Sequence, residues 1–195
     1  MRLILLFFLV MLFSCRAVMG VSEIKEYKAN DIKQFLRHNN INDSVVYFVD
    51  QEYKKSLLAI TKDSHLLKNH MQPLQLYYFS KTGSLISYHI NCNAPGFPNL
   101  NWNYGNVMET FPPKTQTEPD SLLNLEVFFK LLKSSDNNII ARDNDTDFYI
   151  IICWAGFIKR LSKRLIETAN ENLKLNKENK KIRIIYVNTD NLFLN

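Results

Sequence analysis

The sequence predicts an α/β protein in which helices cover a mixed β-sheet. Two apolar runs, residues 148–154 and 182–187, are typical of strands buried on both faces. An amphipathic segment of helical periodicity lies between them, and upstream the residues 74–90 alternate around a short polar turn, as a β-hairpin does. Together these patterns predict a three-layer sandwich that ends in a right-handed parallel βαβ unit.

The composition favours a folded, soluble domain. Hydrophobic residues make up 46% of the 195 and charged residues 22%, which is ordinary for a globular protein. The lysines behind the net charge of +5 are spread along the chain rather than gathered into a stripe, so we expect no nucleic-acid partner. The four histidines lack metal-ligand spacing and the glycines are isolated, so we expect no metal and no cofactor.

The first residues have the pattern of an export signal. Arg2 precedes an apolar run at residues 3–13, and the small residue Ser14 stands before Cys15. The run is too short to cross a hydrocarbon layer of about 30 Å, which takes roughly 20 apolar residues. We therefore expect residues 1–20 to be a signal region that is absent from the folded domain.

The letters Leu-Phe-Ser-Cys resemble the lipobox of bacterial lipoproteins, in which the cysteine becomes the first residue and carries fatty acids such as palmitate. The resemblance implies cleavage before Cys15 and lipidation of its thiol. Ordinary cleavage after Gly20 is the alternative. Both readings predict an exported protein of the bacterial cell envelope, and the lipidated one is held on a membrane, facing the periplasm or the cell surface.

Residues 21–195 then form a single domain. Cap-like residues and apolar spacing predict a short helix at residues 30–36, ahead of a largely buried strand at residues 44–49. A further helix is expected around residues 52–61.

The hairpin has arms at residues 74–79 and 84–90. Gly83 supplies the positive φ that its turn needs, and the second arm alternates with the period of a half-buried strand. From Asp120 onward, apolar residues spaced three and four apart predict a helix; they are Leu122, Leu125, Phe128, Phe129 and Leu132.

Residues 91–119 form a long loop without periodicity, rich in Asn, Pro and Gly but also in aromatic residues. Connections of this length are uncommon unless they are functional or disordered, and the aromatics argue for order. Asn101, Trp102 and Tyr104 mix amides with aromatics, which suits contacts with a carbohydrate or peptide. The same mixture suits a loop that packs its aromatics on the core, so these three residues are a candidate ligand contact only.

The end of the first apolar run resembles the thioredoxin-like superfamily. In that family a buried strand ends in a Trp-Ala pair, here Trp154 and Ala155, and continues through an aromatic, here Phe157, into a Cys-x-x-Cys motif at a helix start. Ile158 and Leu161 stand where the family carries its two cysteines. Because the chemistry needs an activated thiol and a resolving thiol, the usual redox centre is absent.

The order of elements also departs from the family, whose hairpin and closing helix follow its βαβ unit. Here the hairpin lies upstream, which implies a thioredoxin-like sheet with rearranged or permuted strand order. An unrelated α/β sandwich is the alternative. The chain as a whole looks like uncharacterised small lipoproteins of bacteria that end in a cysteine-free redoxin-like segment, and that likeness brings no known activity.

Two cysteines remain in the domain as candidate redox residues. Cys153 lies inside an apolar strand, where a thiol is usually inert, whereas Cys92 follows the hairpin and is more accessible. A disulfide between them stays open, because sequence does not give the distance that a bridge requires.

These patterns favour a non-catalytic envelope lipoprotein whose thioredoxin-like domain binds or scaffolds an envelope protein or peptide. The alternative is a thiol-dependent oxidoreductase that uses Cys92 outside the usual motif. Whether the protein is an enzyme is left open, with the balance toward a binding role.

Overall fold

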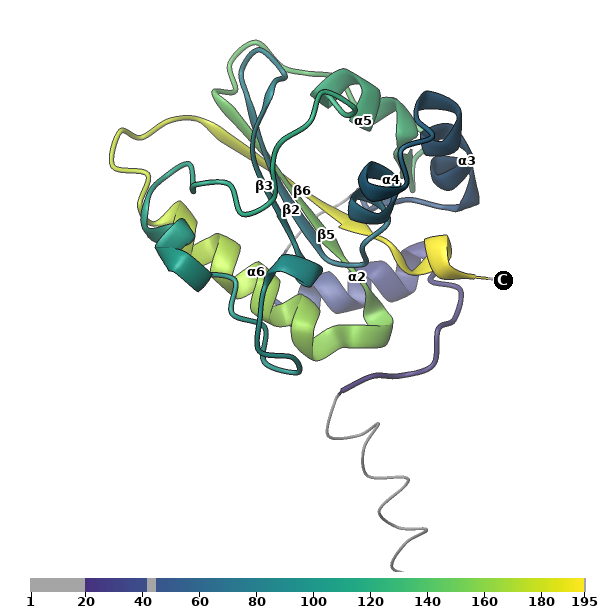
Figure 1. The fold of residues 1–195 in the computed structure, drawn as a ribbon. Helices are drawn as coiled ribbons and strands as arrows, with labels where there is room; N and C mark the ends of the chain where they lie inside the picture. Colours follow the sequence, from purple (N-terminus) through teal and green to yellow (C-terminus); the bar gives the residue numbers. More distant parts are fainter. Residues whose placement is uncertain (1–19, 42–44, 195) are drawn as a thin grey trace, which may run out of the picture.

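A computed structural model describes residues 20–41 and 45–194 (Figure 1). The predicted signal region up to residue 19, with the lipidation site Cys15, and the first residue of the predicted strand 44–49 lie outside the described residues. In the described part, the strands of the sheet are β1 (Tyr47–Phe48), β2 (Gln75–Ser80), β3 (Leu85–Ile90), β4 (Lys133–Ser134), β5 (Phe148–Trp154) and β6 (Ile182–Asn188). The α-helices are α2 (Ala29–His38), α3 (Gln51–Ile60), α4 (Ser64–His70), α5 (Leu125–Leu131) and α6 (Lys159–Leu173), and the 3₁₀ helices are η1 (Asn91–Asn93), η2 (Tyr104–Glu109), η3 (Gly156–Ile158) and η4 (Asp190–Phe193).

The strands form one mixed sheet in the order β3-β2-β5-β6-β1-β4. The central strands β5 and β6 are parallel, with Phe148 opposite Ile182 and Trp154 opposite Asn188, and α6 connects them. The predicted βαβ unit is therefore confirmed. Its first strand is buried almost throughout because the sheet is covered on both faces, as the uninterrupted apolar run predicts.

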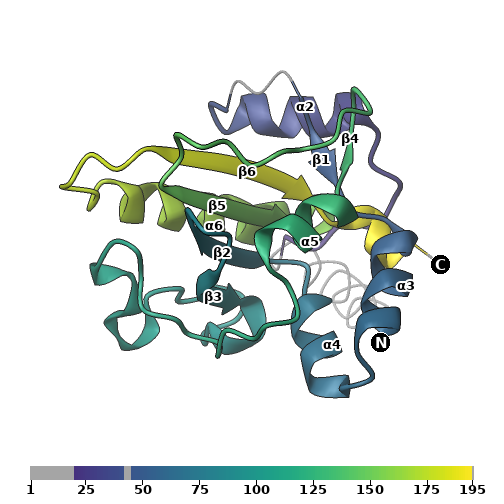
Figure 2. The same ribbon diagram turned by 90° about the horizontal axis from the view of Figure 1, so that it is seen from above.

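The predicted hairpin is confirmed as β2 and β3, and β2 pairs antiparallel with β5. Gly83 has φ +86°, a left-handed conformation that glycine adopts without strain, and it closes the turn through its N–H to the carbonyl of Ser80. The hairpin is thus fastened to the central parallel pair. Figure 2 shows the sheet from above, running from β4 and β1 near α2 to the hairpin.

On the other side of the parallel pair the strands of the sheet are short. β1 has two paired residues, parallel to β6 and antiparallel to β4, so the strand is shorter than the predicted residues 44–49. The alternating burial is nevertheless that of a strand: Val46 packs into the core on one face of the sheet and Val49 into the core on the other.

Helices cover both faces of the sheet (Figure 1). α2 and α6 pack on one face, around the fully buried Leu36, Ile152 and Leu165. α3 and α5 pack on the other, around Leu57 and Phe128. The predicted three-layer α/β arrangement is therefore present. No helix among the described residues combines the length and the hydrophobicity that crossing a bilayer requires.

The helix predicted from Asp120 begins later, at Leu125. Asn124 is its cap, because its side-chain oxygen accepts a hydrogen bond of 2.9 Å from the N–H of Val127. Asp120 instead forms a turn with the N–H of Leu122 at 2.8 Å and turns its other oxygen to a distant histidine, described below.

The long loop of residues 91–119 is fixed to the rest of the domain. It contains η1 and η2, and it buries Leu100, Trp102 and Met108 in the core beneath α6. The buried Asn172 of α6 donates to the carbonyls of Met108 and Thr110, at 2.9 and 2.7 Å.

The same loop covers the outer edge of the sheet. The N–H of Tyr88 in β3 donates to the hydroxyl of Thr115 at 3.1 Å, and the Tyr88 carbonyl accepts from the N–H groups of Gln116 and Thr117. At the opposite edge, β4 is two residues long.

The segment before α2 packs on the start of α6. Ser22 donates its N–H to the carbonyl of Phe157 at 2.7 Å, and the backbone of Tyr27 exchanges hydrogen bonds with the side chain of Asn191. Both cores consist of residues from Tyr27 to Leu192, so a chain that begins at Gly20 contains every contact of the described fold.

Candidate functional site

The site where the thioredoxin-like family carries its cysteines lies after β5, at the start of α6. Ile158 and Leu161 occupy the two cysteine positions, and both side chains are buried in the core between α6 and the sheet. Branched apolar side chains therefore fill this part of the core.

A carboxylate accepts hydrogen bonds from the backbone N–H groups at the start of this helical segment. One oxygen of Asp190 accepts from the N–H of Gly156 at 2.5 Å and from the side-chain amide of Asn188 at 2.6 Å, and the other accepts from the N–H of Phe157 at 3.0 Å. Asp190 is fully buried, and burial raises the pKa of this carboxyl although the three N–H donors lower it. An anion held at a helix start interacts favourably with the unpaired N–H groups there.

Tyr27 closes this position from outside. Its phenol lies so close to Gly156 that a Cβ added there would stand 2.0 Å from the Cζ and Oη atoms of Tyr27. The ring meets Trp154 edge-on, with centroids 6.3 Å apart. Burial, together with the charges of Asp190 and Asp31, raises the pKa of Tyr27 to about 12, so the phenol is neutral at physiological pH.

A cavity of about 580 Å³ opens beside Tyr27, between α2 and the first turns of α6. Phe35 forms part of its wall and stacks on the indole of Trp154, with ring centroids 3.9 Å apart. The residues around the cavity are Lys25, Tyr27, Asp31, Gln34, Phe35, His38, Asn39, Lys159, Arg160 and Lys163. It is therefore a mainly basic hollow at the carboxyl end of β5.

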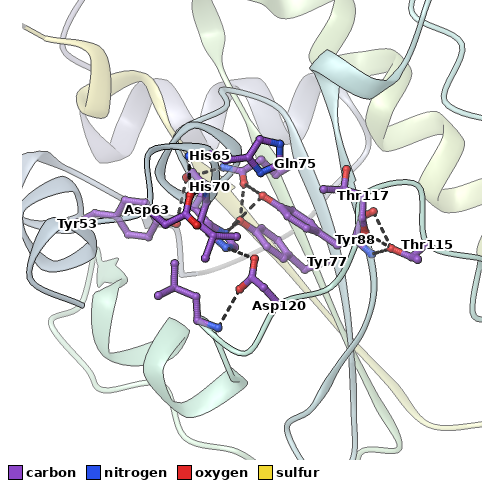
Figure 3. Close-up of polar contacts among 12 residues, drawn as sticks. Tyr53, Asp63, His65, His70, Gln75, Tyr77, Tyr88, Thr115, Thr117 and Asp120 are labelled. Carbon is purple, nitrogen blue, oxygen red and sulfur yellow. Dashed lines mark hydrogen bonds and ion pairs between the residues drawn. The ribbon is translucent and has the colours of Figure 1, made fainter. Parts of the chain in front are cut away.

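A second polar cluster is buried on the other face of the sheet, where α4 meets the hairpin (Figure 3). The ring of His70, which is fully buried, lies 2.9 Å from a carboxylate oxygen of Asp120 through Nε2 and 3.2 Å from the hydroxyl of Tyr77 through Nδ1. The hydroxyls of Tyr77 and Tyr88 both donate to the side-chain oxygen of Gln75.

The backbone completes this cluster. The side-chain amide of Gln75 donates to the carbonyls of His70 and Gln72, at 3.1 and 2.7 Å, and the hydroxyl of Tyr53 donates to the same His70 carbonyl at 3.3 Å. Burial raises the pKa of Asp120, but the hydrogen bond and charge of His70 and the N–H of Leu122 outweigh it and leave that pKa below its ordinary value. The cluster thus ties α4, the hairpin and the chain before α5 together.

The two candidate redox cysteines are both free thiols and are not joined. Cys153 is buried in β5, and burial raises the pKa of its thiol. Cys92 is exposed in η1, where its Sγ donates to the side-chain oxygen of Gln72 at 3.0 Å. Neither thiol lies at the position after β5 that the family uses.

The candidate ligand-contact residues of the loop do not form one surface. Trp102 is 2% exposed and belongs to the core, whereas Tyr104 is 61% exposed and Asn101 faces solvent. The side chain of Asn101 accepts the N–H of Asn103 within its own turn. Among the described residues, no three His, Cys, Asp or Glu side chains are placed together as metal ligands.

Sequence reasoning missed Asp190 and the pair of His70 and Asp120. Asp190 had a usable signal: it follows the second parallel strand by two residues, and the carboxyl ends of parallel strands meet at one edge of a sheet. No comparable signal joins His70 to Asp120, which are 50 residues apart and come from segments without a shared pattern.

Fold and site together define an α/β protein with a six-stranded mixed sheet, a buried carboxylate on the N–H groups that follow β5, and a basic cavity beside it. No protein-family model matches the chain, and neither a curated protein nor a solved structure is significantly similar to it.

Proposed function

We propose that this protein is an exported, lipid-anchored protein of the bacterial envelope whose domain, a rearranged thioredoxin-like sheet, is a non-catalytic binding module. Its ligand site is the cavity between α2 and α6. The arrangement β3-β2-β5-β6, with α6 inside the parallel unit and α5 after the hairpin, supports the thioredoxin-like reading. The elements are those of that family, in a changed chain order.

The observation that carries the proposal is the carboxylate of Asp190 on the N–H groups of Gly156 and Phe157. In a redoxin, the partial positive charge of a helix start stabilises a thiolate. Here that charge is already used by a buried side chain of the same protein. These N–H groups therefore have a structural role, and the ligand site that we propose is the open cavity next to them.

The thiol part of the proposal is tested on a chain of residues 20–195. We expect no catalysis of insulin disulfide reduction, and an unchanged free energy of unfolding and ligand binding in Cys92→Ser. Turnover with insulin that disappears in Cys92→Ser would contradict a non-catalytic role and establish the alternative enzyme.

The anchor is tested separately on the full chain in bacterial cells. We expect the wild type in the membrane fraction with a mass increase of its N-terminal peptide, and Cys15→Ser in the soluble fraction. Cys92→Ser is the matched control, because it removes a thiol without touching the lipobox. Equal fractionation of the wild type and Cys15→Ser would exclude lipidation at Cys15.

The alternative thiol-dependent oxidoreductase has one observation in its favour, the exposure of Cys92. The contacts of that thiol are to side-chain amides. The thiol donates a hydrogen bond to the oxygen of Gln72, and the amide nitrogen of Asn91 lies 3.9 Å from the sulfur. Such neighbours do not supply the positive charge that activates a nucleophilic cysteine. The binding role therefore fits the structure better.

A further inference from the structure

The cavity between α2 and α6 has a strong excess of positive charge. Four cationic side chains face one carboxylate; the charged side chains are Lys25, Lys159, Arg160, Lys163 and Asp31. Lys159 and Lys163 are one helical turn apart, so they project from the same face of α6.

Three of these cations, Lys25, Lys159 and Lys163, are incompletely neutralised by the described residues. The side chain of Lys159 forms no ion pair or hydrogen bond with any residue that the structure describes. The ammonium of Lys163 is 3.7 Å from Glu167 in an exposed pair, and that of Lys25 lies 5.5 Å above the ring of Tyr27. Exposed pairs of this kind add little to stability, so an incoming anion competes with them at little cost.

The wall also contains two aromatic side chains, Tyr27 and Phe35, that are fixed by packing. Phe35 is 8% exposed and held by its stack on Trp154, and Tyr27 is 6% exposed. A volume of about 580 Å³ is within the range of small-molecule sites. The cavity therefore offers several cations around a rigid aromatic wall.

We infer that this cavity binds a phosphate ester, with the phosphate among the side chains of Lys159, Lys163 and Lys25 and the organic part against Tyr27 and Phe35. A phosphate carries more charge than a single carboxylate and has more acceptor oxygens, which matches several separate ammonium donors better. This inference rests on the proposed function and names the ligand class of that site.

A phospholipid headgroup and a soluble phosphate ester share this chemistry, and the geometry favours the headgroup. Gly20 lies against Arg160 at the edge of the cavity, and five residue steps separate it from Cys15. A fully extended chain of that length spans about 18 Å. A lipid on Cys15 would hold the cavity that close to the headgroups of its own membrane.

Binding is measured by isothermal titration of the 20–195 chain with glycerol 3-phosphate and with inorganic phosphate, at constant ionic strength. We expect saturable binding of glycerol 3-phosphate that is tighter than that of inorganic phosphate, because only the ester also reaches the aromatic wall. Absence of saturable binding to either probe, and to the vesicles described below, would overturn the inference.

The decisive variant is Lys159→Gln with Lys163→Gln, for which we expect binding weakened about tenfold or more from the loss of two charge-assisted hydrogen bonds. The matched control is Lys62→Gln with Lys177→Gln, which removes the same charge from exposed positions outside the cavity. The control should bind like the wild type. Equal weakening in both variants would show diffuse attraction and overturn the cavity site.

The source of the phosphate is distinguished by sedimentation with vesicles of phosphatidylglycerol or of phosphatidylcholine. Retention on phosphatidylglycerol that glycerol 3-phosphate displaces assigns the headgroup, and binding of glycerol 3-phosphate without retention assigns a soluble ester. Retention that glycerol 3-phosphate does not displace would place the contact outside the cavity and contradict the inference. A chain that passes the thiol and anchor tests but fails these would leave the proposed function standing.

Discussion

At the scale of single residues, Asp190 has the most consequential position. It supplies an acceptor to each of two backbone N–H groups and to the amide of Asn188, at a point where β5 turns into α6. A buried carboxylate without partners would be strongly unfavourable, so these three donors are what makes its burial tolerable. Both oxygens are required, because the donors approach both.

Asp190→Asn should lower the free energy of unfolding by about 1 to 3 kcal/mol at neutral pH. The asparagine amide has one oxygen, so its NH₂ group must point either at the N–H of Phe157 or at the N–H of Gly156 and the amide of Asn188. Either way, donor faces donor and at least one hydrogen bond is lost. Urea denaturation measures the change. The control Asp145→Asn alters an exposed carboxylate and should stay within about 0.5 kcal/mol of the wild type; equal stabilities of the two variants would refute the role of Asp190.

His89 gives the fold a sensitivity to acid. Burial lowers the pKa of His89 to about 4, whereas an unfolded chain has the ordinary value of 6.5, so between these pH values the unfolded state binds more protons. Stability from this residue is complete above pH 6.5 and is lost as the pH falls toward 4, by up to about 3 kcal/mol. In His89→Gln this part of the pH dependence of unfolding should vanish. The exposed His65→Gln should keep it; loss of the slope in both variants would assign it elsewhere.

At the scale of elements, the fold depends on polar contacts that join segments distant in sequence. α4 has no strong amphipathic pattern, yet its last residue, His70, is anchored by Tyr77 of β2 and by Asp120 before α5. Asn172 does the same for the long loop under α6. Such buried polar networks are stable only when every member has its partner.

The coupling between His70 and Asp120 can be measured by a double-mutant cycle with alanine at each position. We expect a coupling free energy of about 1 to 3 kcal/mol, because the ring is fully buried and the pair shares a network. The exposed pair of Glu171 and Lys174, treated identically, should give less than about 1 kcal/mol. A coupling near zero for the buried pair would mean that the two residues act independently.

At the scale of the whole molecule, the segment before α2 is part of the domain rather than a simple tether. It places Tyr27 on Gly156 and pairs Ser22 with Phe157, so it covers the start of α6. The cover over the start of α6 and part of the cavity wall are thereby supplied by one short stretch of chain.

A chain that begins at Ala29 should be less stable than one that begins at Gly20 by about 3 kcal/mol or more, mainly through the loss of the buried Tyr27 side chain. Acrylamide quenching of tryptophan fluorescence should also increase, because Tyr27 covers Trp154. Tyr27→Ala in the longer chain should reproduce most of the loss of stability. If the short chain and the long chain unfold alike, the segment is only a linker.

The parts of the fold that sequence predicted are those with strong local patterns. The apolar strands β5 and β6, and the hairpin around Gly83, have periodicities that burial imposes directly. β1 and β4 pair over two residues each: the apolar run at residues 44–49 predicted the strand that contains β1 but not its shortness, whereas β4 has no pattern of its own and pairs with β1, which in turn pairs with β6. The displaced start of α5 has the same origin, since Asp120 is engaged by His70 through a contact that no local window contains.

The candidate site divides in the same way. The absence of cysteine at residues 158 and 161 was readable from the sequence alone. The carboxylate that closes the position, and the cavity beside it, depend on which side chains the topology brings to the carboxyl end of β5. That assembly is tertiary: the place of Asp190 two residues after β6 is a local signal for the carboxylate, whereas the cavity has none.

The covered edge of β3 also bears on how copies of the protein behave at high local concentration. Residues 115–117 already occupy the backbone groups of Tyr88, and the opposite border of the sheet ends in the two residues of β4. Among the described residues, a neighbouring copy therefore finds no long free strand against which to add its own. Copies held close together, as the proposed anchor would hold them, are thus protected against edge-to-edge pairing of their sheets.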